Sequence, residues 1–79
     1  MIIIEFSGTR PSTALAKALE LVLENTYNLE TRQEVTPETE GVQLLLEQDG
    51  IEKYPVGRFS SMPKLETLNF HLEIAGLLN

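Results

Sequence analysis

The residues with the clearest chemical potential gather at one turn. Gly8, Thr9, Arg10 and Ser12 precede or open a segment with helical spacing, and the run from 57 to 61 offers a similar set of residues before a second such segment. Free backbone N–H groups at a helix start, with hydroxyls and one arginine, can bind an anion such as phosphate. Ser, Thr and Gly are also the residues that cap ordinary helices. The turn therefore predicts either a small-anion or phosphometabolite site or a simple helix cap.

Residues for catalysis or metal binding are sparse elsewhere. The chain has no cysteine, which excludes disulfides, thiolate metal sites and CxxC redox chemistry. Its one histidine, His71, lies beside the apolar stripe of a predicted helix, where a packing role is the commoner one. Glu66 and Glu73 do not stand at a recognised ligand spacing from it. Neither a P-loop nor a GxGxxG motif occurs. We therefore expect no enzyme activity, no metal and no cofactor.

Negative charge is concentrated in the middle of the chain. The formal net charge is −6. The stretch from 30 to 52 holds one base, Arg32, and these acids: Glu30, Glu34, Glu38, Glu40, Glu47, Asp49 and Glu52. Because phosphate contacts need clustered Lys and Arg, we expect no direct binding of nucleic acid. The acidic segment predicts a solvated surface, a docking patch for a basic protein, or a nucleic-acid mimic directed at a DNA-binding protein.

Length and composition predict one small globular domain spanning residues 1–79. The chain is 42% hydrophobic and 23% charged, which is ordinary for globular proteins. No apolar run approaches the roughly 20 residues of a membrane span, and the first residues lack the basic region of a signal peptide. We therefore expect no membrane association and a cytoplasmic location.

Four strands are predicted from hydrophobic patterning. Residues 2–6 and 42–48 are nearly continuous in apolar character, which is typical of central strands. Residues 29–35 alternate and are polar, as in an edge strand. Asp49-Gly50 predicts a hairpin into a strand at 51–56, where Pro55 removes a ladder donor and favours an edge position. A loop is expected over 57–62.

Two helices complete the pattern. The first extends from Pro11 to about Tyr27 and carries polar residues at spacings of four and three. The second extends from Pro63 to about Leu78. Its predicted core stripe is Leu65, Leu68, Leu72 and Ala75, widened by Phe70 and Ile74, and its polar stripe is Glu66, Asn69, Glu73 and Gly76.

The element order β-α-β-β-β-α predicts a two-layer α/β fold. A right-handed crossover makes the first two strands parallel, and the hairpin makes the last two antiparallel. The simplest four-stranded mixed sheet has the order 2-1-3-4, with strand 3 antiparallel and both helices on one face. The other face is left open. Ile3 and Leu45 are expected there as an apolar spot among polar residues, which predicts either an ordinary solvated face or a surface for a partner or a second copy.

This layout resembles the thioredoxin-like fold. Leu44-Leu45-Leu46, Asp49-Gly50, Val56-Gly57 and the closing helix from Lys64 follow the order of a thioredoxin C-terminal half. The N-terminal half, with Gly8-Thr9-Arg10-Pro11-Ser12-Thr13 before a long helix, is similar to the KaiB-like, cysteine-free branch. The resemblance implies a non-redox member of that superfamily, since Ser7 to Arg10 stand where a CxxC motif would lie and no proline occupies the cis-proline position.

These observations favour a non-enzymatic module that binds another protein, such as a small regulator, an inhibitor or a subunit. The predicted contact residues are those of the acidic segment and the open sheet face: Glu30, Glu34, Glu38, Glu40, Glu47, Ile3 and Leu45. A homodimer is an alternative, because a domain of this size buries only about 60% of its unfolded surface.

Overall fold

The predicted α/β architecture is observed. A computed structural model describes residues 1–78. Within this range the elements are β1 (Ile2–Phe6), α1 (Arg10–Asn25), β2 (Thr31–Val35), β3 (Val42–Gln48), β4 (Glu52–Phe59) and α2 (Leu65–Ile74). The four strands form one mixed sheet in the order β2-β1-β3-β4. Strand β2 is parallel to β1, whereas β3 is antiparallel to both β1 and β4.

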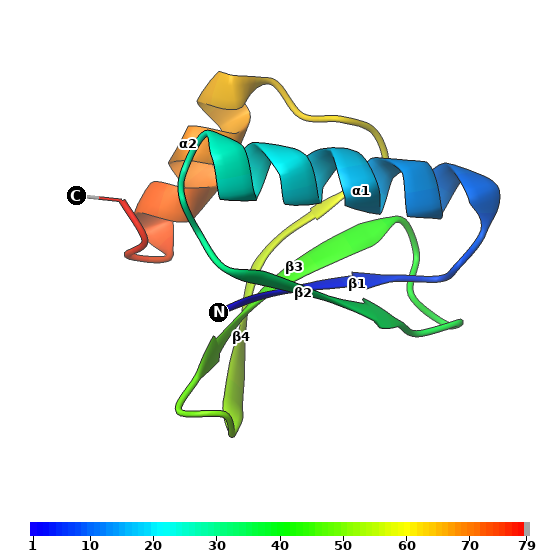
Figure 1. Cartoon of the computed structure of the whole chain (residues 1–79), viewed down its shortest axis with the longest axis horizontal. Helices are drawn as coiled ribbons and strands as arrows, with labels where there is room; N and C mark the ends of the chain where they lie inside the picture. The colour runs from blue at the N-terminus through cyan, green and yellow to red at the C-terminus, as the bar shows by residue number, and fades with distance from the viewer. Residues whose placement is uncertain (79) are drawn as a thin grey trace.

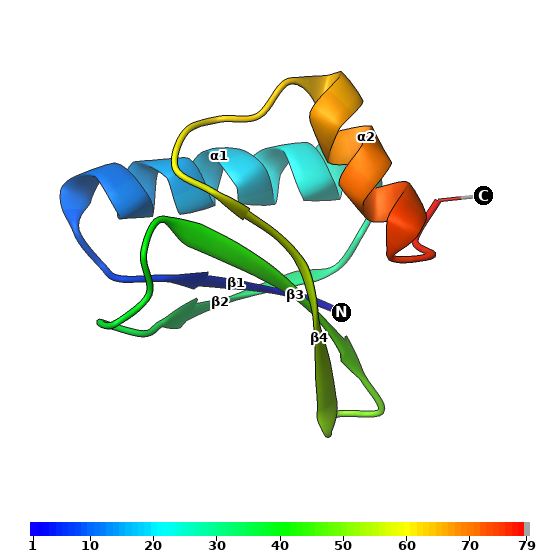
Figure 2. The ribbon, with the colours of Figure 1, turned by 180° about the vertical axis from the view of Figure 1, so that it is seen from behind.

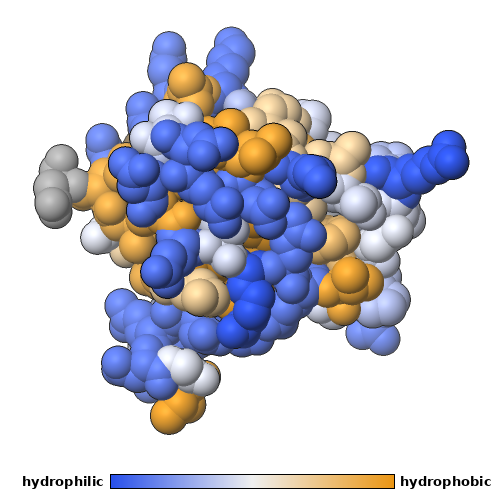
Figure 3. All heavy atoms as spheres, viewed as in Figure 1, coloured by the Kyte–Doolittle hydropathy of each residue, from blue (hydrophilic) through white to orange (hydrophobic). Residues whose placement is uncertain are grey.

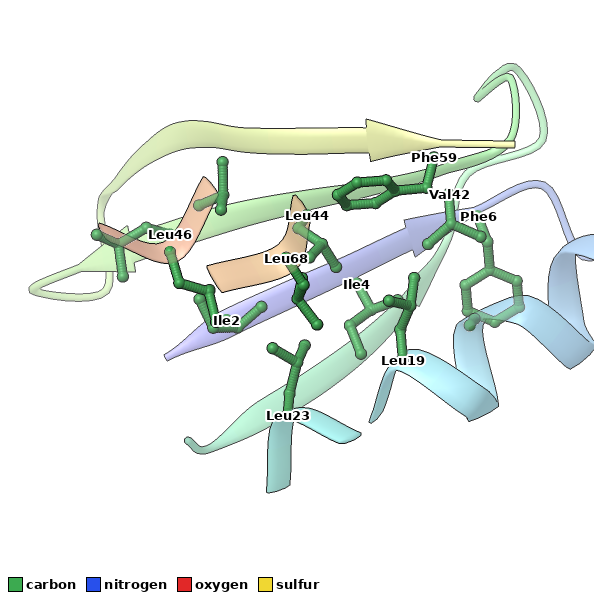
Figure 4. Close-up of a cluster of buried hydrophobic side chains, with 13 residues drawn as sticks. Ile2, Ile4, Phe6, Leu19, Leu23, Val42, Leu44, Leu46, Phe59 and Leu68 are labelled. Carbon is green, nitrogen blue, oxygen red and sulfur yellow. The ribbon is translucent and has the colours of Figure 1, made fainter. Parts of the chain in front are cut away.

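The helices α1 and α2 lie on the same face of the sheet, as predicted (Figures 1 and 2). Alternate side chains of β1 and β3, including Ile4 and Leu44, point toward Leu19 and Leu23 of α1 and Leu68 of α2 (Figure 4). Burying one such side chain completely stabilises a fold by about 1.5–3 kcal/mol. This single layer of contacts between the helices and the sheet is therefore the main source of stability.

Helix α1 matches its predicted pattern closely. The Thr9 hydroxyl accepts a hydrogen bond from the Ser12 N–H, so Thr9 is the N-cap. Ala16, Leu19 and Leu23 are buried, while the polar stripe faces outward. The helix crosses the sheet and places its N-terminus near the end of β1 (Figure 1).

Strand β4 is longer than predicted. The register pairs Leu44 with Gly57 but Leu45 with Pro55, so Val56 is an extra residue, a β-bulge. The bulge resets the alternation of side chains, and Val56 and Phe59 both enter the core. The loop expected over 57–62 begins only at residue 60, because residues 57–59 belong to β4. The edge position predicted from Pro55 is confirmed.

Helix α2 is shorter than predicted because Gly76 ends it. Gly76 has a φ of +77°, and its N–H donates to the Glu73 carbonyl at 3.0 Å. The Leu77 N–H donates to the Leu72 carbonyl at 2.9 Å. These two bonds form a Schellman motif, which terminates a helix at a left-handed glycine. Neither helix of residues 1–78 is long and apolar enough to cross a membrane.

Candidate functional site

The seven acids of the segment from 30 to 52, which include the five predicted acidic contact residues, are divided among three places in the fold. Glu38 and Glu40 lie in the loop between β2 and β3, at one end of the sheet. Glu30, Asp49 and Glu52 lie at the opposite end. Strand β3 separates the two ends by seven residues, which is roughly 20 Å at about 3.3 Å per residue. The remaining two acids lie on the sheet between these groups.

Those two acids, Glu34 and Glu47, belong to a cluster of ion pairs on the sheet face that carries no helix. Arg32 Nη2 lies 2.8 Å from Glu34 Oε2 and 2.9 Å from Glu47 Oε2, and Lys53 Nζ lies 3.4 Å from Glu34 Oε1. The hydrogen bond from Arg32 lowers the pKa of Glu34 below its usual value, against the opposing effect of desolvation. The bonds to Glu34 and Glu47 raise the pKa of Arg32. Two cations therefore offset two carboxylates, and the face is nearly neutral here.

The apolar spot expected on this face is not exposed. Ile3 has no exposed surface, and Leu45 is only 9% exposed. The register places Ile3 between Arg32 of β2 and Leu45 of β3. Long charged side chains cover apolar neighbours with their aliphatic stems while their charged ends reach water. The expectation that Ile3 and Leu45 offer a contact surface is therefore wrong.

The predicted anion site at the start of α1 is a hydrogen-bonded cap. The Ser12 Oγ donates to the Thr9 carbonyl at 3.1 Å and lies 3.1 Å from Ser7 Oγ and 2.9 Å from Thr9 Oγ1. The Ser12 N–H is bonded to Thr9 Oγ1, and Pro11 has no N–H to donate. Of the first N–H groups of the helix, as the structure describes it, only that of Arg10 is left for a ligand.

A shallow cleft adjoins this cap and brings the two predicted hydroxyl turns together. Its volume is about 270 Å³, and it is lined by Ser7, Thr9, Pro11, Ser12, Leu15, Gly41 and Ser60. Arg10, the predicted anchor for an anion, is exposed and does not line it. Gly8 adopts a φ of +90° and is also outside the lining. Hydroxyls and positive charge are thus separated, which is unfavourable for an anion site.

His71 packs as a structural residue. Its Nδ1 lies 3.2 Å from the carbonyl oxygen of Val56, the extra residue of the bulge. Its ring meets that of Phe59 edge to face, with centroids 5.2 Å apart. Gly57 makes room for both rings, because an added Cβ would lie 3.2 Å from His71 Nδ1. Among residues 1–78 no cluster of three or more His, Asp or Glu side chains is placed to hold a metal ion.

A hollow lies between α2 and β4. This α2/β4 groove has a volume of about 350 Å³ and is lined by Leu46, Gln48, Tyr54, Pro55, Val56, His71, Ile74 and Ala75. Ligand sites in proteins usually measure roughly 300–1,000 Å³, so the groove is at the lower end of that range. Five of its eight lining residues are apolar, which suits an apolar side chain better than a charged ligand.

Large apolar side chains continue from the groove onto the outer side of α2. Ile74 is 70% exposed and Phe70 is 59% exposed, and Tyr54 on β4 is 45% exposed. Residues four apart share one face of a helix, so Phe70 and Ile74 form a stripe. In Figure 3 hydrophobic residues gather at the left, toward α2, whereas the front is largely hydrophilic.

Sequence reasoning missed the groove because it assigned this stripe to the core. Leu68 and Leu72 are the fully buried residues of α2, while Leu65, Phe70 and Ile74 are exposed. The signal available in the sequence was the width of the apolar face predicted for this helix. That face is wider than a single contact with the sheet can bury, so the remaining apolar side chains lie on the outside of α2.

The observed sheet order is the one that the thioredoxin-like resemblance implies. Sheet order and helix placement describe an architecture, and many unrelated functions share one architecture. The resemblance to the thioredoxin-like superfamily therefore stays a prediction, and any function must be supported by the geometry of the surface. No protein-family model, no curated protein and no solved structure matches this chain.

Proposed function

We propose that this chain is a non-enzymatic protein-binding module and that the α2/β4 groove is its contact surface. The observation that carries the proposal is the exposure of Tyr54 and Ile74, which line one hollow, with the exposed Phe70 one turn before Ile74 on α2. Single exposed apolar residues are normal on protein surfaces, but adjacent ones around a hollow are typical of interaction sites. Aromatic anchors also dominate the energetics of many protein interfaces.

The groove is better suited to side-chain contacts than to backbone pairing. Strand β4 is at the edge of the sheet, where a partner strand could add. Pro55 lies in the middle of this strand and removes a donor, which is how natural edges resist pairing. The Tyr54 hydroxyl already donates to Glu52. We therefore take the bound segment to insert apolar side chains between α2 and β4.

The acidic segment has a different role in this proposal. Its carboxylates are spread over both ends of the sheet, and Glu34 and Glu47 are paired with Arg32. The segment as a whole therefore supplies a long-range negative potential that steers a partner, and only its hairpin acids Asp49 and Glu52 lie beside the groove. The small-anion and nucleic-acid-mimic alternatives stand on fewer observations, because neither a free donor cluster nor a continuous row of acids accompanies them.

Panning a random peptide library displayed on phage tests the proposal. Selected peptides are synthesised and their affinities are measured for the native chain, for Ile74→Gln and for Leu21→Gln. Leu21 is a matched control, because it is a half-exposed apolar residue on α1, outside the groove. Both substitutions are neutral and compatible with a helix.

We expect Ile74→Gln to raise the dissociation constant on the order of tenfold, the effect of losing about 1.4 kcal/mol of apolar contact. Leu21→Gln should leave the dissociation constant unchanged. Amide NMR shifts caused by the peptide should include Tyr54, Val56 and His71. Failure to select any peptide, or equal affinity of the Ile74→Gln chain, would refute the proposal.

A further inference from the structure

We infer that the segment held in the α2/β4 groove carries lysine or arginine beside its apolar anchors. The inference rests on the proposed function and adds the chemistry of the partner. It comes from the charges around the groove, which are of one sign.

Acidic side chains border the groove at its hairpin end. Asp49 follows the lining residue Gln48, and Glu52 accepts the hydrogen bond of the lining residue Tyr54. Both acids are exposed to solvent. An apolar hollow with carboxylates at one end complements a segment that has apolar anchors and a flanking cation.

The nearby basic side chains do not offset these acids. Lys53 is adjacent to Tyr54 in the sequence, but alternation along β4 directs it to the opposite face, where it pairs with Glu34. Arg58 donates to Gln43 on that same face. Lys64 precedes α2, ten residues before Ile74 and roughly 15 Å away at about 1.5 Å per residue. The field at the groove is therefore negative.

A second copy of the chain is a poor occupant for the same reason. A two-fold dimer through this groove would bring the same surface of each copy together. The hairpin acids Asp49 and Glu52 of both copies would then lie in one interface, between chains that each have a net charge of −6. Like charges placed opposite each other weaken association. Nucleic acid and anionic lipid are disfavoured by the same sign of charge.

The peptides selected by panning provide the probe for this inference. Each selected peptide is compared with a version in which every Lys and Arg is replaced by Gln. The chain is compared with Asp49→Asn and Glu52→Gln, and with Glu38→Gln as the matched control. Each substitution removes one negative charge, and Glu38 is an exposed acid at the far end of the sheet. Affinities are measured by fluorescence anisotropy at low and high salt.

We expect the selected peptides to be basic and to lose affinity when their cations are replaced. Asp49→Asn and Glu52→Gln should each weaken binding by about 1.5- to 5-fold, the range of a solvent-exposed ion pair, and high salt should reduce the difference. Glu38→Gln should have a smaller effect than either.

Two results would overturn the inference and leave the proposed function intact. One is selection of neutral or acidic peptides whose binding still depends on Ile74. The other is equal affinity of the basic and Gln-substituted peptides, with both rim variants matching Glu38→Gln. A concentration-dependent dimer that Ile74→Gln abolishes would instead identify a second copy as the occupant. Binding that is insensitive to Ile74→Gln would reject the proposed function itself.

Discussion

Substitutions along α2 should separate residues that hold the helix from residues that bind a partner. Leu72 is fully buried, so Leu72→Ala removes core contacts and leaves a cavity. Such changes cost about 2–5 kcal/mol. The whole chain, with 79 residues, has an expected stability of roughly 4–12 kcal/mol. Leu72→Ala should therefore remove a large part of the free energy of unfolding.

Ile74→Ala should behave differently although it lies two residues away. About 30% of this side chain is covered, since 70% is exposed. That fraction of the roughly 1.5–3 kcal/mol for complete burial is at most about 1 kcal/mol. The better helix propensity of alanine offsets part of it. The expected change in the free energy of unfolding is therefore near zero, while affinity for the selected peptides falls.

Urea unfolding followed by circular dichroism measures both variants at the same protein concentration. A loss of stability in Ile74→Ala that matches the loss in Leu72→Ala would refute the reasoning. It would mean that the outer stripe of α2 is packed in solution, and the groove would then not be a free surface. Retained peptide affinity in a stable Ile74→Ala chain would contradict the assignment of Ile74 to the binding surface.

Three further predictions test the bulge, the ion pairs and the helix start. Gly57→Ala should lower the free energy of unfolding by about 1–2 kcal/mol, because the new Cβ would lie 3.1 Å from Phe59 Cζ and 3.2 Å from His71 Nδ1. Denaturant titration should show a smaller loss of stability when the same substitution is made in a His71→Ala chain. An increase in stability on Gly57→Ala would disprove the crowding. Since the pKa of Glu34 is lowered from 4.5, its ion pairs stabilise the fold above pH 4.5, and this contribution is lost as the pH falls through the lowered value. Glu34→Gln should accordingly be less stable than the native chain at neutral pH and equal to it in strong acid, and a difference that persists in acid would contradict the ion-pair origin. Phosphate titrated into the labelled chain should leave the amides of residues 8–13 unshifted, because the Ser12 and Thr13 N–H groups are already bonded to Thr9 and the Arg10 side chain lies outside the cleft. Shifts confined to those amides would restore the anion site.

The order of the strands followed from patterns that are local in sequence. The continuous apolar runs in β1 and β3 indicated strands that are buried on both faces and therefore central. Pro55 indicated that β4 lies at an edge of the sheet. With one right-handed crossover and one hairpin, few arrangements were left. The extents of β4 and α2 were predicted less well. Each depends on one backbone event, the bulge at Val56 and the left-handed Gly76.

The candidate site was the least predictable feature. Sequence reasoning grouped acids that are neighbours along the chain, but the strands carry them to opposite ends of the sheet. It also predicted that Ile3 would be exposed on the open face of the sheet. In the structure Ile3 is covered there, and Arg32 of the neighbouring strand β2 lies next to it. Contacts of this kind join residues distant in sequence, and a periodic pattern holds no information about them.

The sequence by itself determined which segments form strands and helices, which strands are central, and which chemistries the residue types exclude. These properties depend on side-chain type and on spacing within one element. The tertiary structure decided which side of α2 is buried, where the charges pair, and that a groove lies beside β4. Those features arise where separate elements meet, because the width of the sheet and the bulge in its last strand set how much of a helix can be covered.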